Sequence, residues 1–221
     1  MPRTALLLGA TGLVGRHTLD LLAHDARWDR VVTLSRRPLD AVSARHEPGV
    51  LDFGELARTP ERFACDDLFC ALGTTMKQAG SKEAFRRVDY DYIVDAAMLA
   101  VAEGARQLVL VSAYGANARS RLFYNRVKGE AEDAVQQLGF ASVGVLRPSL
   151  LTGDRAASRP GEVWGERILT LLSPILRGPL RALRPTPAQS VARALVELAA
   201  RRAPGVTVLG PVEIRQLGGA A

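Results

Sequence analysis

The chain has 221 residues, 48% of which are hydrophobic, and a formal net charge of +6. This length and apolar content are typical of one globular domain with a substantial core, and they exclude a disordered chain. The basic charge comes from arginines that are scattered among acids, with few aromatic residues to stack bases, so we expect no nucleic-acid partner. An anionic small ligand explains part of the charge equally well.

Cysteine spacing and hydropathy exclude several other classes of protein. Cys65 and Cys70 are five residues apart, with neither a second pair nor a histidine cluster nearby, so we predict no metal site. The N-terminal apolar run passes directly into glycines, without the cleavage pattern of a signal peptide, and no run is long enough to cross a bilayer. We therefore expect a cytoplasmic protein with reduced thiols and no membrane span.

Short apolar runs alternate with longer amphipathic ones along the chain. Strands are predicted at residues 4–9, 30–35, 49–52, 67–72, 107–112, 142–146 and 206–209, and helices at 13–24, 83–103, 123–138 and 190–201. This alternation predicts βαβ units, and the continuously apolar strands indicate a parallel sheet covered on both faces. The predicted fold class is α/β, a Rossmann-like doubly wound parallel sheet with a small C-terminal substrate or lid segment.

Glycines follow the first predicted strand and open the first predicted helix. Gly9, Gly12 and Gly15 have the spacing GxxGxxG, which permits a tight turn and lets the backbone approach a pyrophosphate at the helix N-terminus. The sequence therefore predicts a dinucleotide-binding turn. Its expected cofactor contacts are Gly9, Thr11, Gly12, Leu13, Val14 and Gly15.

The end of the second strand indicates which dinucleotide is bound. A carboxylate at this position would accept hydrogen bonds from the adenosine ribose, but the chain has Ser35, Arg36 and Arg37. Two guanidiniums and a hydroxyl can bind a 2′-phosphate through charge-assisted hydrogen bonds, so we expect NADPH to be preferred over NADH. Exposed arginines in an arginine-rich protein are the alternative explanation.

Two further strand ends supply expected cofactor contacts. Asp52 and Phe53 follow the weak third strand, where they could meet the adenine amino group. Small residues follow the fourth strand and let a cofactor pass close to the backbone. The expected contacts there are Leu72, Gly73, Thr74 and Thr75.

A phenol and an ammonium lie one helical turn apart in the stretch LFYNRVKGEAEDAV. On a helix Tyr124 and Lys128 share one face, so the ammonium would favour the ionised phenol, which can then act as a general acid or base. Ser112 ends the fifth strand and could hydrogen-bond a substrate carbonyl. Tyr114 is a rival phenol without a lysine four residues on, so we expect at most a substrate contact from it. Ser112, Tyr124 and Lys128 are the predicted catalytic residues.

The region from 150 to 188 differs in composition from the rest of the chain. It is first polar and irregular, and then apolar but interrupted by Pro174, Pro179 and Pro185. We interpret residues 1–221 as a single domain in which 150–188 form a small inserted lid or substrate region. A partner-binding surface and simple packing on the sheet edge are the alternatives.

The motifs resemble the short-chain dehydrogenase/reductase superfamily, within its atypical group similar to Tat-interacting-protein-like oxidoreductases and bacterial NAD(P)H-binding relatives. The matching segments are GATGLVG at 9–15, FCALGTT at 69–75, AGSKEAFRRVDYDY at 79–92, LVLVSAYGA at 108–116, YNRVKGEAE at 124–132 and LRPSLLTGDR at 146–155. The resemblance implies that Lys128 also contacts the cofactor and that Pro148 and Ser149 flank the nicotinamide. Asp89 stands where many extended relatives have asparagine, and the C-terminal region is short for a sugar-nucleotide epimerase.

Two functions are compatible with these residues. The first is an NADPH-dependent reductase that acts on a small carbonyl compound, with Tyr124 as the proton donor and a small-molecule substrate as its partner. The second is an NADPH-binding regulatory or interaction module with little or no catalysis. An oligomer is possible in either case.

Overall fold

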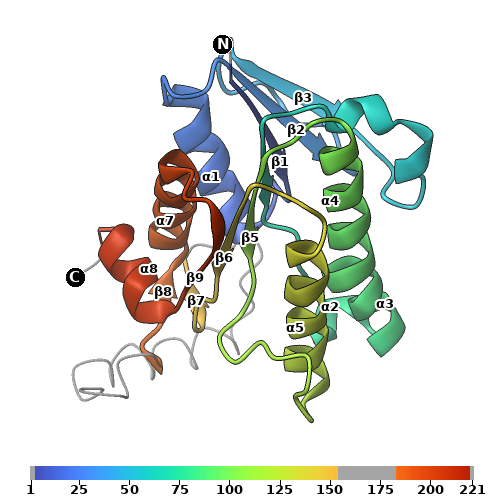
Figure 1. Ribbon diagram of the computed structural model, residues 1–221, viewed down its shortest axis with the longest axis vertical. Helices are drawn as coiled ribbons and strands as arrows, with labels where there is room; N and C mark the ends of the chain where they lie inside the picture. The colour runs from blue at the N-terminus through green and yellow to red at the C-terminus, as the bar shows by residue number, and fades with distance from the viewer. Residues whose placement is uncertain (1–2, 154–182, 220–221) are drawn as a thin grey trace.

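The computed structural model describes residues 3–153 and 183–219, and these residues form a seven-stranded sheet (Figure 1). All six strand pairings are parallel, and the strand order is β3-β2-β1-β4-β5-β6-β9. The strands are β1 (Thr4–Leu8), β2 (Arg30–Ser35), β3 (His46–Val50), β4 (Asp67–Cys70), β5 (Gln107–Val111), β6 (Ser142–Leu146) and β9 (Gly205–Leu209). The structure confirms the predicted α/β Rossmann-like class.

The strand order reverses between β1 and β4. After β3 the chain crosses back over β2 and β1 to add β4 on the other side of β1. In open parallel sheets of this kind, ligands bind in the crevice at the carboxyl ends of the strands, at the point where the order reverses. The topology therefore places any ligand site beside the ends of β1 and β4.

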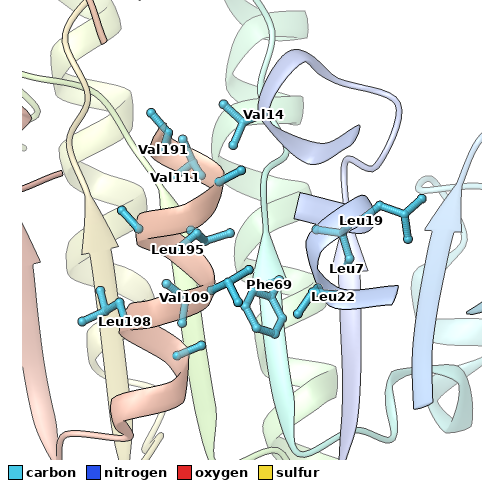
Figure 2. Close-up of a cluster of buried hydrophobic side chains, with 14 of the residues drawn as sticks. Leu7, Val14, Leu19, Leu22, Phe69, Val109, Val111, Val191, Leu195 and Leu198 are labelled. Carbon is cyan, nitrogen blue, oxygen red and sulfur yellow. The ribbon is translucent and has the colours of Figure 1, made fainter. Parts of the chain in front are cut away.

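Helices cover both faces of the sheet, as Figure 1 shows. One face carries α1 (Leu13–His24), α7 (Ala188–Arg201) and α8 (Pro211–Leu217), and the other carries α4 (Tyr92–Ala102) and α5 (Phe123–Gln136). Successive strand side chains point to opposite faces, so Leu7 packs in the first layer while Leu6 and Leu8 pack in the second. Figure 2 shows the first of these cores, with Leu7, Phe69, Val109 and Val111 from the strands against Val14, Leu19 and Leu22 of α1 and Val191, Leu195 and Leu198 of α7.

The helix predicted over 83–103 is not continuous. Its first part is α3 (Lys82–Arg86), its last part is α4, and a π-helical turn, labelled η3 (Arg87–Asp91), lies between them. The turn carries Asp89, whose side chain is fully buried. A π turn inserts one extra residue into a helix, which hydrophobic periodicity alone does not reveal.

Other predicted elements differ from the observed ones mainly in their bounds. Several short elements were not predicted. The third strand is His46–Val50, whereas 49–52 was expected. No element was expected at the helices α2 (Met76–Ala79) and α8 or at the 3-10 turns η1 (Leu56–Arg58) and η2 (Pro60–Phe63). None of the helices in the described parts of the chain is long and apolar enough to span a membrane.

The two ends of the expected lid region pair with each other in a separate two-stranded sheet. β7 (Leu151–Thr152) pairs in parallel with β8 (Thr186–Pro187). The hydroxyl of Ser149 donates to the carbonyl of Arg184 and lies 2.9 Å from the hydroxyl of Thr186. Residues 154–182, which include Pro174, Pro179 and most of the predicted lid, lie outside the described residues.

Candidate active site

The turn after β1 requires glycine at two positions. Gly9 has φ of +84°, and a Cβ atom there would lie 2.5 Å from the carbonyl oxygen of Ala71 at the end of β4. A Cβ on Gly15 would lie 2.0 Å from the carbonyl oxygen of Gly9, so α1 can pack against the turn only without a side chain there. The amide of Gly12 closes the turn by donating to the Gly9 carbonyl at 2.9 Å.

The N-terminus of α1 can receive an anion. Gly12 caps the helix without a side chain, and the first turn carries no acidic residue. The first N–H groups of the helix therefore have no capping side chain, and the positive end of the helix dipole is not opposed by a carboxylate there. Thr11, Gly12, Leu13 and Val14 line a cavity at this end. This arrangement fits the pyrophosphate of a dinucleotide.

The cavity has a volume of about 1200 Å³ and lies at the carboxyl edge of the sheet. This volume is above the range of about 300–1,000 Å³ that is typical of pockets for drug-sized ligands. It brings together residues that the sequence analysis assigned to the cofactor and to catalysis, namely Thr11, Gly12, Leu13, Val14, Leu72, Gly73, Thr74, Thr75, Ser112, Tyr124, Lys128, Pro148 and Ser149. The cavity is also lined by residues that were not among the predicted site residues, namely Arg16, Ala71, Lys77, Gln78, Asp89, Val111, Ala113, Leu150, Leu151 and Leu183.

Tyr124 and Lys128 lie on the first turns of α5 and both line the cavity. The ring of Tyr124 packs against Phe85 of α3, with the ring centroids 5.3 Å apart, and its side chain is 37% exposed. Lys128 is 5% exposed, and its Nζ lies 2.7 Å from Oδ1 of Asp89. The structure thus holds a partly exposed phenol and a buried, paired ammonium at the same cavity.

The hydroxyl of Ser112 belongs to a buried polar network. It donates its proton to the carboxylate of Glu132, a residue of α5 that is 1% exposed. Arg147, just after β6, donates to both oxygens of the same carboxylate, from Nε at 3.1 Å and also from its terminal nitrogen. A hydroxyl has one proton, so toward the cavity Ser112 presents lone pairs. Glu132 lies four residues after Lys128, a spacing that places it on the same helix face.

Other predicted cofactor contacts lie outside the described cavity lining. Arg36 and Arg37 are exposed after β2, and the hydroxyl of Ser35 closes the turn there by donating to the carbonyl of Arg37 at 2.6 Å. The carboxylate of Asp52 accepts the amide of Gly54 at 2.8 Å. Phe53 is buried, with its ring centroid 5.5 Å from that of Tyr92. Their contacts with a cofactor remain predictions.

Cys70 is a buried thiol, and Cys65 is a half-buried one. Burial raises the pKa of Cys65 to about 12 and that of Cys70 to about 11, so both are protonated at neutral pH. Neither is an activated nucleophile. Within the described parts of the chain, no group of three or more histidine, cysteine, aspartate or glutamate side chains is arranged to hold a metal ion.

Comparison with known proteins gives a family match and several relatives. The model of the NAD dependent epimerase/dehydratase family matches residues 5–178. The protein HTATIP2 of Rattus norvegicus is 37% identical over 72% of this chain and 67% of its own length. The mitochondrial protein FMP52 of Lodderomyces elongisporus is 32% identical over 91% of this chain and 88% of its own length.

Solved structures agree with the fold. The structure of MoeE5 in complex with UDP-glucose and NAD has a TM-score of 0.69 and covers 98% of this chain and 81% of its own chain, at 19% identity. At this level of identity the likeness supports the fold alone.

The names of the fungal relatives correct one expectation. Those from Lodderomyces elongisporus, Emericella nidulans and Candida albicans are named as mitochondrial proteins, which contradicts the expected cytoplasmic location. The expectation failed because a missing secretory cleavage pattern does not distinguish the cytoplasm from a mitochondrion.

The motifs, the fold and the relatives agree on one assignment. The glycine turn, the reversal of strand order and the cavity at the carboxyl edge are the features of an NAD(P)-binding Rossmann fold. The matches confirm the resemblance to the atypical short-chain dehydrogenase/reductases. The chain belongs to the NAD dependent epimerase/dehydratase family.

Proposed function

We propose that this protein is an NADPH-dependent reductase of a small carbonyl compound. The observation that carries the proposal is the single cavity that joins the N-terminus of α1 to Tyr124 and Lys128. A dinucleotide whose pyrophosphate lies at the helix end would extend along the carboxyl edge of the sheet toward these two side chains. The expected binding site and the proton donor therefore line the same open cleft.

The residues of the chain supply the proton side of the reaction. When bound, the reduced nicotinamide supplies a hydride to the carbonyl carbon and is oxidised. Tyr124 donates its hydroxyl proton to the carbonyl oxygen, which becomes the hydroxyl of an alcohol, and the phenolate takes up a proton from solvent. The Lys128 ammonium stabilises that phenolate. Ser112, whose proton is held by Glu132, serves as a hydrogen-bond acceptor at the cavity wall.

NADPH is the proposed cofactor because of the charges after β2. Arg36 and Arg37 are both exposed at the carboxyl edge, so their guanidiniums are free to approach a 2′-phosphate. MoeE5 was solved with NAD, so a protein of this fold binds the dinucleotide without a 2′-phosphate. The two arginines favour the phosphorylated form in this chain.

The residues that line the rest of the cavity support a small substrate with apolar character. Leu150, Leu151 and Leu183 line the cavity near the paired ends of β7 and β8, and Tyr114 lies at its wall. Tyr114 is 48% exposed, and its amide is fixed by the carbonyl of Pro148 at 2.8 Å. These side chains suit the apolar part of an aldehyde, ketone or quinone.

The test is NADPH oxidation with a panel of aldehydes, ketones and quinones. We expect turnover with at least one class, and we expect Tyr124→Phe to lower kcat by about 10²-fold or more while NADPH binding is kept, because only the proton donor is removed. Tyr114→Phe is the matched control, and a change in KM is expected from it. If nothing in the panel turns over and NADPH still binds tightly, with Tyr124→Phe leaving that binding unchanged, the alternative function of a cofactor-binding regulatory module is favoured over the reductase.

A further inference from the structure

A buried carboxylate that the proposed chemistry does not use lies beside the catalytic lysine. Asp89 is fully buried in the π-helical turn η3 and has two partners on different elements. Its Oδ1 lies 2.7 Å from the Lys128 Nζ on α5, and its Oδ2 accepts the backbone amide of Thr74 at 2.9 Å. One side chain thus links η3, α5 and the turn that follows β4.

That turn passes directly over the ion pair. A Cβ atom on Gly73 would lie 3.4 Å from Oδ1 of Asp89 and 3.5 Å from Nζ of Lys128. Gly73 and Thr74 also line the cavity where we expect the cofactor to pass. The position of the lysine and the position of the cofactor turn are therefore set by the same carboxylate.

We propose that Asp89 is a positioning residue of the reductase site, which holds the Lys128 ammonium against the turn after β4 and supplies the counter-charge for this buried cation. The inference rests on the proposed function, because Lys128 matters there as the cation beside the phenol. The extra residue of the π turn is consistent with this role, since such insertions are frequent at functional sites.

The electrostatics of the pair support this role. Burial on its own lowers the pKa of Lys128, but the Asp89 carboxylate reverses the effect, and Tyr124 on α5 and Cys70 on β4 add to it. The net result is a pKa above the ordinary lysine value. Without the carboxylate, burial dominates, and the buried ammonium loses its proton at lower pH.

The chain offers a direct measurement, because Lys77, Lys82 and Lys128 are its only lysines. In protein labelled with isotopic lysine, the Nζ resonance of Lys128 should titrate above the ordinary lysine pKa. In Asp89→Asn it should titrate at least about 1 pH unit lower than in the wild type. Asp95→Asn, which removes an exposed carboxylate from the neighbouring α4, is the matched control and should leave it unchanged.

The same variants distinguish a positioning role from a purely structural one. In the NADPH oxidation assay, the kcat of Asp89→Asn should fall at alkaline pH. The kcat of Asp95→Asn should not show this fall. The proposal is overturned if Lys128 of the wild type titrates below the ordinary lysine pKa, a result that does not require a folded variant. It is also overturned if Asp89→Asn changes neither the titration nor the pH profile. Absence of turnover in the wild type would contradict the proposed function, while the resonance would still test the pairing.

Discussion

At the scale of single residues, the proton of Ser112 decides how the site can work. The hydroxyl was expected to donate to a substrate carbonyl, but in the structure it donates to Glu132. Glu132 is held in turn by Arg147. The proposed chemistry therefore places proton donation on Tyr124 and leaves Ser112 to accept a hydrogen bond.

This division of roles predicts unequal effects of two substitutions. Ser112→Ala should lower kcat by about tenfold, less than Tyr124→Phe, because it removes an acceptor and not the proton donor. It should also lower the free energy of unfolding by about 1–3 kcal/mol, because the buried Glu132 carboxylate loses one donor. Steady-state kinetics and urea unfolding measure the two effects. If Ser112→Ala abolishes turnover as completely as Tyr124→Phe, Ser112 is a donor to the substrate.

Some of the residue pairs in the site could be predicted from the sequence, and others could not. Tyr124 and Lys128 were predictable because a spacing of four places them on one helix face. Asp89 was noticed only as a departure from a family pattern, and its contact with Lys128 could not be predicted, since a π turn and a distant helix bring the two together. Glu132 stands at helical spacing from Lys128, but only the fold places Ser112 and Arg147 beside it.

At the scale of elements, the start of β3 carries a buried histidine. His46 is 4% exposed, its Nε2 lies 2.8 Å from the hydroxyl of Thr33, and its Nδ1 accepts the amide of Val42 at 3.2 Å. With Nδ1 as an acceptor, the ring is neutral. Burial lowers the pKa of His46 below its ordinary value.

The lowered pKa gives a pH dependence of stability. Below about pH 6.5 the unfolded chain binds a proton at His46 that the folded chain does not, so stability should fall as the pH drops from neutral toward the folded-state pKa. The urea midpoint measured across this range should show the loss. His46→Gln should reduce this loss, whereas His24→Gln, at an exposed position of α1, should not. Equal slopes in the wild type and His46→Gln would exclude His46 as the cause.

The helices and strands that were predicted correctly are those whose bounds follow from the hydrophobic pattern of the sequence. The bounds of α1, β2 and β6 agree with the prediction, because their apolar residues face a core on one or both sides. The interruption at η3 and the short pairing of β7 with β8 were not predicted. A π turn and a two-residue strand are stabilised by tertiary contacts, such as those of Asp89 and Ser149, which leave no periodic signal.

At the scale of the whole molecule, the reversal of strand order brings distant parts of the chain to one cavity. The N-terminus of α1 and the start of α5 are more than a hundred residues apart, yet both line it. The alternation of elements predicted this convergence, because parallel strands bring their carboxyl ends to one edge. The compartment was not predictable in this way, since location depends on targeting and not on the fold.

The exposed arginines at the same edge predict a cofactor preference. NADPH should stabilise the protein against heat at a concentration about tenfold lower than NADH, because in the proposed function two guanidiniums bind the 2′-phosphate. Changing both Arg36 and Arg37 to alanine should remove the difference. Arg58→Ala, at an exposed position of η1, is the control for loss of positive charge. If NADH stabilises the wild type as well as NADPH does, the arginines do not select the cofactor.

The proposed reaction is hydride transfer from NADPH to a carbonyl, with Tyr124 as the proton donor. It is tested most directly with NADPH that carries deuterium at the transferable position of the nicotinamide, followed by mass spectrometry of the alcohol product. We expect one deuterium on the former carbonyl carbon of the product formed by the wild type, and we expect Tyr124→Phe to form this product at a rate lower by about 10²-fold or more. An alcohol product without deuterium, or equal rates for the two proteins, would contradict it.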